Sequence, residues 1–244
     1  MNGYGRIAAF PAASTGNDLV SLEATRPERT TLPRFYSRIL TAAEQEGYRQ
    51  LESSGLPFDQ YVWFCWSVKE SVYKFKKRQF PGLLFAPLRI VIRRIVPPSG
   101  AEGFYRAIIE GATIGDCSTT DDCSTIGDSS SAVSGDIRGA VLYARSLIRD
   151  GVIVTTVCED EAFTGTYWGF SSIDSSAYAD QSAAVRELVL GKLKELLGCE
   201  DLRLQKDDAG CPVVVTGGRG PAIPVSLAHH HRHIAYSFYL NKVV

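Results

Sequence analysis

The sequence predicts an α+β fold in which an antiparallel sheet packs with helices. Segments with the 3.6-residue period of an amphipathic helix are interspersed with short runs rich in valine and isoleucine, without the regular spacing of βαβ units. The chain has 244 residues, of which 45% are apolar, so it can bury a sizeable core. We expect residues 1–244 to form a single domain.

Two short elements are expected in the N-terminal part of the chain. Gly16 could let the backbone approach a ligand, and Asp18 would project from the edge of a strand. Further on, Thr41 is followed three residues later by Glu44, which fits a capping box. The box predicts a helix that runs from there to about Leu51.

A longer amphipathic helix is predicted over residues 61–78. Its apolar side carries Cys65, Val68, Val72 and Phe75, and its polar side carries Trp63, Ser67, Glu70, Lys74 and Lys77. Pro81 and Gly82 end this helix, and residues 88–96, which are rich in isoleucine and valine, are expected to form a strand.

The next segment, residues 112–138, is dominated by serine, threonine, aspartate and glycine, so we expect a mobile insertion there. The elements predicted after it are strands over 151–158 and 164–170, a helix over 180–197, a hairpin of 202–206 and 212–215, and mostly strand over 224–240. The helix over 180–197 is expected to turn Val185, Leu188, Leu193 and Leu196 inward.

Charge and composition argue against several classes of protein. Lysine plus arginine (26) nearly balances aspartate plus glutamate (27), so no nucleic-acid or membrane partner is expected. No secretory signal or apolar membrane span is recognisable, and a cytoplasmic location is the expectation. The sequence also lacks the motifs of P-loop, dinucleotide-binding, zinc-peptidase and hydrolase sites.

Glu70 and Lys74 are the first candidates for chemistry, because they are four residues apart on one side of the predicted helix. A carboxylate at this spacing could hold a divalent cation while an ammonium one turn later meets a phosphate. A solvent-exposed ion pair has the same spacing, so spacing alone leaves both interpretations open.

The sequence around these two residues resembles a known family. Residues 66–74, WSVKESVYK, match the pattern WxxKExxxK of the 4'-phosphopantetheinyl transferase superfamily. The other segments similar to motifs of this family are GND at 16–18, FYSRILT at 35–41 with Glu44, GCP at 210–212 and VSLAH at 225–229. Their order is that of the short members typified by holo-acyl-carrier-protein synthase.

The resemblance implies an activity. The enzyme would transfer the 4'-phosphopantetheine arm of coenzyme A to a serine hydroxyl of an apo acyl or peptidyl carrier protein and release 3',5'-ADP. Asp18 and Glu70 would ligate Mg²⁺ together with the coenzyme A pyrophosphate. The metal would neutralise charge on the phosphoryl group and on the leaving group.

Further roles follow from the same resemblance. Glu70, Lys69 and Lys74 would be the catalytic residues, with both lysines at the phosphates, and Glu70 or a magnesium-bound water would accept the proton of the attacking serine. Ser226 and His229 would also bind coenzyme A, His229 at its nucleotide end.

Two positions depart from the family pattern. Ala228 stands where the family usually has a serine, and the absence of the serine hydroxyl would remove a phosphate contact. Ser21 stands where an acidic residue is common, which would loosen the metal site. These departures leave two alternatives open: a catalytically silent module that binds coenzyme A or a carrier protein, and an assembly protein whose transferase-like helix is only structural.

Two expectations concern partners. A run of cationic residues opposed by Glu70 alone would attract a carrier protein that is acidic around its modified serine; the run consists of Lys69, Lys74, Lys76, Lys77, Arg78, Arg89, Arg93 and Arg94. Because the chain shows one set of each motif, a complete site could need a second subunit, as in a head-to-tail homotrimer, or residues 85–180 could supply the missing half.

Overall fold

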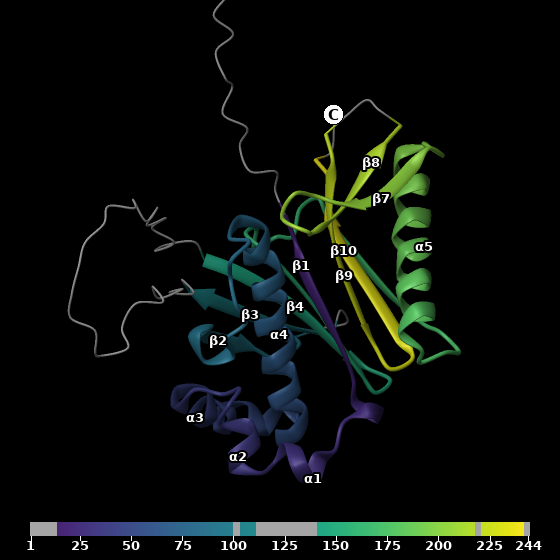
Figure 1. The fold of residues 1–244 in the computed structure, drawn as a ribbon. Coiled ribbons are helices and arrows are strands. Elements are labelled where there is room, and N and C mark those ends of the chain that lie inside the picture. The colour runs from purple at the N-terminus through teal and green to yellow at the C-terminus, as the bar shows by residue number, and fades with distance from the viewer. Residues whose placement is uncertain (1–13, 100–102, 111–140, 218–220, 242–244) are drawn as a thin grey trace, which may run out of the picture.

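The computed structural model describes residues 14–99, 103–110, 141–217 and 221–241. The insertion expected at 112–138 lies outside the described residues. Within them, the strands form two five-stranded antiparallel sheets, each with one long helix beside it (Figure 1). The predicted α+β class is confirmed, although the strands form two sheets where one was expected.

The first sheet combines strands from both sides of the insertion. Its order is β1 (Gly16–Ser21), β5 (Val152–Cys158), β4 (Val141–Arg149), β3 (Phe104–Glu110) and β2 (Ile92–Val96). Strand β1 lies at one edge of this sheet, and Asp18 is opposite Thr155 of β5. The strand expected over 88–96 begins later because Pro87–Arg89 forms a turn of 3₁₀ helix.

The second sheet is built entirely from the C-terminal part of the chain. Its order is β6 (Thr166–Ser172), β10 (His233–Tyr239), β9 (Ile223–His230), β8 (Pro212–Thr216) and β7 (Leu202–Lys206). The predicted hairpin agrees closely with β7 and β8. The stretch expected to be mostly strand is a second hairpin, in which His230 pairs with His233 and His231 takes a positive φ of 56° in the turn.

Short helices precede the first long one. They are two 3₁₀ turns, Leu22–Ala24 and Glu52–Ser54, and the helices α1 (Pro27–Thr30), α2 (Pro33–Tyr36) and α3 (Ala42–Leu51). Helix α3 begins with the predicted capping box: Glu44 N donates to Thr41 Oγ1 at 3.3 Å, and Thr41 N donates to Glu44 Oε2 at 2.8 Å.

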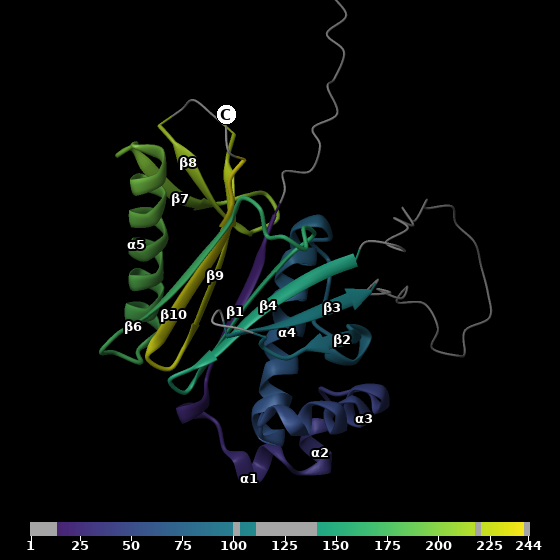
Figure 2. The same ribbon diagram turned by 180° about the vertical axis from the view of Figure 1, so that it is seen from behind.

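The two long helices are α4 (Phe58–Gln79) on the first sheet and α5 (Tyr178–Leu197) on the second (Figures 1 and 2). Helix α4 buries more of its surface than predicted, because Ser67 on the expected polar side is fully buried. Helix α5 buries Val189, which the prediction omitted, and leaves Leu196 36% exposed. No helix of the described ranges is both long and apolar enough to cross a membrane.

Gly16 explains why β1 lies so close to α4. A Cβ atom built on Gly16 would be 2.0 Å from the carbonyl oxygen of Ser71 and 2.8 Å from the backbone nitrogen of Phe75. Any side chain at this position would push the strand away from the helix. The glycine was expected to admit a ligand, but in this structure it admits the backbone of the long helix.

The two sheets meet along β1 and β9. Asn17 N donates to Ser226 Oγ at 2.9 Å, and Ser21 N donates to His230 Nδ1 at 3.0 Å. Between these two links, Leu19 packs in one apolar cluster with Ala228. Side chains of β9 therefore join the two halves of the molecule at the strand that carries Asp18.

Candidate active site

Helix α4 and strand β1 bring three of the predicted site residues together. Glu70 and Lys74 are one turn apart on a partly exposed side of α4, and Asp18 extends from β1 toward them. Lys74 Nζ lies 3.2 Å from Asp18 Oδ1, with 26% of the lysine side chain and 11% of the aspartate side chain exposed. The close contact at Gly16, two residues before Asp18, holds this strand against the helix.

The two carboxylates fit a magnesium ion. Asp18 Oδ2 is buried and has no hydrogen-bond partner among the described residues. Burial raises the pKa of Glu70, the charge of Lys74 opposes the rise, and the charge of Asp18 adds to it. Buried carboxylate oxygens without partners are costly unless a cation compensates them, and oxygen donors of this kind suit Mg²⁺.

The chain supplies only part of a coordination shell. The described residues contain no group of three or more histidine, cysteine, aspartate or glutamate side chains that could hold a metal ion. A site with two carboxylates needs further oxygen ligands, which for Mg²⁺ commonly come from substrate phosphates and water. The donor set therefore fits an ion that is bound together with a phosphate ligand.

His229 approaches this group from the second sheet. Burial lowers the pKa of His229, and the positive charge of Lys74 lowers it further. The imidazole packs edge-on against the ring of Tyr178, the first residue of α5, with 5.2 Å between ring centroids. At neutral pH the ring is uncharged and can both donate and accept a hydrogen bond.

Residues from both sheets of one chain thus contribute to the candidate site. Asp18 and Lys74 come from the first half, and His229, whose charge state responds to Lys74, comes from the second. The expectation of a homo-oligomer, in which a second subunit could complete the site, stays a prediction.

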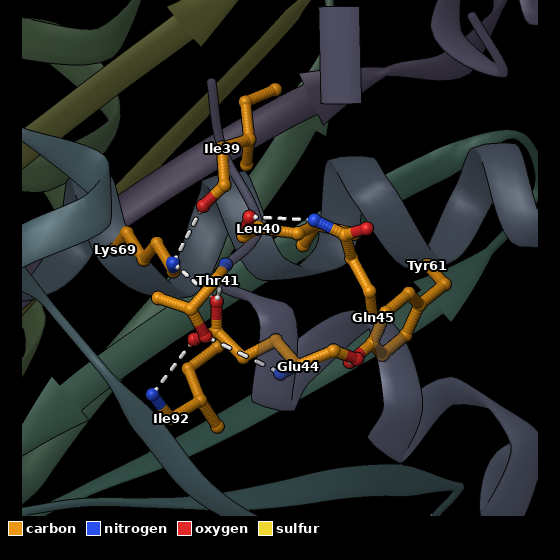
Figure 3. A network of polar contacts seen from close by, with 8 residues as sticks. All are labelled: Ile39, Leu40, Thr41, Glu44, Gln45, Tyr61, Lys69 and Ile92. Carbon is orange, nitrogen blue, oxygen red and sulfur yellow. Dashed lines mark hydrogen bonds and ion pairs between the residues drawn. The ribbon is translucent and has the colours of Figure 1, made fainter. Parts of the chain in front are cut away.

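Lys69 lies away from this group, in the core beneath α4. Its ammonium donates to Glu44 Oε2 at 2.7 Å and to the carbonyl oxygen of Ile39 at 2.6 Å, and its side chain has no exposed surface (Figure 3). The other oxygen of the Glu44 carboxylate accepts from Ile92 N at 2.9 Å. We therefore revise the phosphate-binding and catalytic role expected for Lys69 to a structural one.

Alternation along the strands separates residues that the motifs place side by side. Ser226, Ala228 and His230 face the first sheet, whereas His229 faces the other way. The Ser226 hydroxyl accepts from β1 and is 4% exposed, so it links the sheets instead of presenting an open contact to coenzyme A. Ala228 is surrounded by apolar side chains, so its missing hydroxyl removes no polar contact within the fold.

The same alternation determines the direction in which the Ser21 side chain points. Ser21 is three residues beyond Asp18, so its side chain points to the opposite face of β1. It is fully buried, and its backbone nitrogen donates to His230. A carboxylate at position 21 would point away from the ion that Asp18 could hold, so the departure at this position leaves the candidate metal site unchanged.

The cationic run is less of a surface patch than predicted. Lys69 and Lys76 are buried, and the Arg78 guanidinium donates to the carbonyl oxygens of Pro212, at 2.9 Å, and Val225. These contacts attach strands β8 and β9 to the end of α4. Sequence reasoning missed this role of Arg78 and the contact of Tyr178 with His229, because both depend on segments that meet only in the fold.

Comparison with known families agrees with this geometry. A family model described as the 4'-phosphopantetheinyl transferase superfamily matches residues 14–105. The match confirms the resemblance over the segment that carries Asp18, Glu70 and Lys74, and it supports phosphopantetheinyl transfer as the general reaction. A comparison with curated proteins gave no match.

Proposed function

We propose that this protein transfers the 4'-phosphopantetheine arm of coenzyme A to a serine hydroxyl of an apo acyl or peptidyl carrier protein, with Mg²⁺ as the metal ion. The observation that carries the proposal is the position of Asp18 beside Glu70 and Lys74, within the segment that matches the transferase superfamily. The unpartnered Asp18 Oδ2 supports a cation at this place.

Each side chain has a role that its surroundings favour. Asp18 and Glu70 would hold the metal ion with oxygens of the coenzyme A pyrophosphate. Lys74 now balances Asp18, and a metal ion bound there would free the ammonium to pair with a phosphate oxygen. The uncharged His229 would offer a hydrogen bond to the nucleotide part of coenzyme A.

The reaction exchanges one phosphorus–oxygen bond for another. The serine oxygen forms a bond to the phosphorus of the phosphopantetheine arm, the bond from that phosphorus to the bridging oxygen of the pyrophosphate breaks, and 3',5'-ADP leaves as an anion with that oxygen in its 5'-phosphate. Glu70, or a water bound to the metal ion, would accept the serine proton as the general base. The metal ion would supply charge neutralisation on the transferred group.

The test is mass spectrometry of candidate apo carrier proteins after incubation with the protein, coenzyme A and Mg²⁺. We expect the mass of the phosphopantetheine arm to be added to at least one carrier. Glu70→Gln and Asp18→Asn should abolish the addition and leave the fold intact, because each keeps the shape of the side chain and removes one carboxylate.

Glu187→Gln is the matched control, because Glu187 is exposed on α5 and the substitution is the same chemical change. This variant should transfer at the rate of the parent. Near-normal transfer by folded Glu70→Gln would contradict the roles of Glu70 as metal ligand and base. Coenzyme A binding in calorimetry without transfer to any carrier would favour a silent binding module instead.

A further inference from the structure

A second cationic site lies on the first sheet, on the face that α4 does not cover. Tyr105 and Ala107 of β3 point into the core shared with α4, so Arg106 between them points to the opposite face. Three arginines, Arg94, Arg106 and Arg145, come from three neighbouring strands. With Tyr143, Glu161 and Phe163 they line a pocket of about 170 Å³.

Strand register places like charges opposite one another in this pocket. Arg106 of β3 is paired directly with Arg145 of β4. A register shift between Ile92 and Arg94 forms a β-bulge in β2, and both residues after Ile92, Arg93 and Arg94, are exposed. Like charges directly opposite on one face of a sheet destabilise the fold. The pairing of Arg106 with Arg145 therefore costs stability, and such a cost is expected at a functional site.

The countercharges present do not neutralise the group. Arg93 pairs with Glu110 at 3.4 Å, at the edge of the cluster. Arg145 is held in place by the ring of Phe163, 4.4 Å from its guanidinium carbon, and donates to the carbonyl oxygen of Ala162 at 3.2 Å. Arg94 and Arg106 make no ion pair with any residue in the described part of the chain.

The backbone carbonyl of Glu161 also accepts from Arg145, at 3.5 Å, and the Glu161 carboxylate is the single negative side chain among the lining residues. The pocket therefore presents three guanidinium groups and one carboxylate. Guanidinium groups recognise the oxygens of phosphate through paired hydrogen bonds. Arg145, which is held in place, lies next to Arg106, and Arg94 follows on the next strand; the last two make no ion pair among the described residues, so the three are arranged for such an anion.

We propose that the Arg94–Arg106–Arg145 pocket binds a phosphate group, free or carried by a nucleotide. It is separate from the candidate active site, because Asp18, Glu70 and Lys74 lie on the α4 side of the same sheet. A bound phosphate would remove the repulsion between Arg106 and Arg145, and its binding would therefore stabilise the folded protein.

Thermal unfolding of the full chain tests the proposal with sodium phosphate against sodium chloride at matched ionic strength. Phosphate should raise the Tm of the parent above its value in chloride, and Arg106→Gln should lose this rise. In dilute chloride, Arg106→Gln should unfold at a temperature equal to or above that of the parent, because the substitution relieves the repulsion. An equal rise in the parent and in Arg106→Gln would overturn the proposal, and so would no rise in the parent.

Two controls locate the effect. Arg149→Gln removes an exposed arginine from the end of β4, outside the pocket, and should keep the rise. A Lys74→Met background excludes phosphate bound at the candidate active site, and the rise that depends on Arg106 should persist in it. Repeating the measurement with adenosine 5'-monophosphate distinguishes the sources: a larger rise than with phosphate assigns a nucleotide, and an equal one assigns free phosphate.

Discussion

Replacing Lys69 by methionine separates a structural role from a catalytic one. The Lys69 ammonium is 2.7 Å from Glu44 Oε2 and 2.6 Å from the carbonyl oxygen of Ile39, and the two side chains of the ion pair are 0% and 2% exposed (Figure 3). Methionine keeps the aliphatic length and removes the charge. The Glu44 carboxylate would then be buried without a cation.

The cost can be worked out from this geometry. Removing one partner of a buried ion pair costs about 3–5 kcal/mol, because the other charge stays desolvated. Glu44 keeps two backbone donors, Thr41 N and Ile92 N, so we expect a loss near the lower end, about 3 kcal/mol. This is a large part of the total of about 5–15 kcal/mol that is usual for a folded domain.

Urea unfolding measures the loss directly, as a lower midpoint with an unchanged slope. The folded variant should bind coenzyme A as the parent does. Because Glu44→Gln removes the stranded charge, Lys69→Met combined with Glu44→Gln should cost less than the sum of the two single substitutions. The assignment is refuted if Lys69→Met loses less than about 1 kcal/mol of stability, a typical net hydrogen bond, and also binds coenzyme A more weakly.

Three more predictions concern neighbouring parts of the site. In metal-free buffer, Glu70→Gln should raise the Tm at neutral pH, because folding raises the pKa of the Glu70 carboxyl. Such a group lowers the stability of the folded protein as the pH rises through the folded-state pKa, so the gain from its removal should disappear below about pH 4.5. A gain that is the same at all pH values would contradict this. Ala228→Ser should lower stability by about 1–3 kcal/mol in urea unfolding, because it buries a hydroxyl among Leu19 and Val154, and tighter coenzyme A binding would show that the hydroxyl reaches a phosphate after all. Arg78→Glu should destabilise far more than Lys77→Glu, because Arg78 donates to carbonyl oxygens of β8 and β9, whereas Lys77 donates to the nearby carbonyl oxygen of Leu83. Equal urea midpoints would contradict this.

Local signals in the sequence predicted the local structure well. The capping box of Thr41 and Glu44 is present at the start of α3, and the hairpin predicted over 202–206 and 212–215 agrees with β7 and β8. In both cases the side chains that determine the structure are within a few residues of one another. Gly210 has a φ of 77°, which the tight turn requires.

Interactions between distant segments were not predictable in this way. Strands β3 and β4 were missed, although their buried and exposed residues alternate; the two pair with each other although residues 111–140 separate them in the sequence. The partner of Lys69 is 25 residues upstream, and helical periodicity cannot say that a lysine will be buried. The motif therefore predicted the helix, but it did not predict that Lys69 is buried against Glu44 and Ile39.

The same distinction explains the candidate site. The VSLAH motif presents Ser226, Ala228 and His229 as one group, but the two-residue period of a strand sends His229 to one face of β9 and the other two to the opposite face. On that opposite face, Ser226 and Ala228 fasten β9 to β1, the strand that carries Asp18. Neighbouring residues of the motif therefore have different roles. One face of β9 holds the two sheets together, and the other carries His229, which lies near Lys74. A substitution of Ser226 should therefore change the affinity for coenzyme A indirectly, by moving β1. A substitution of His229 should change it by removing a direct contact.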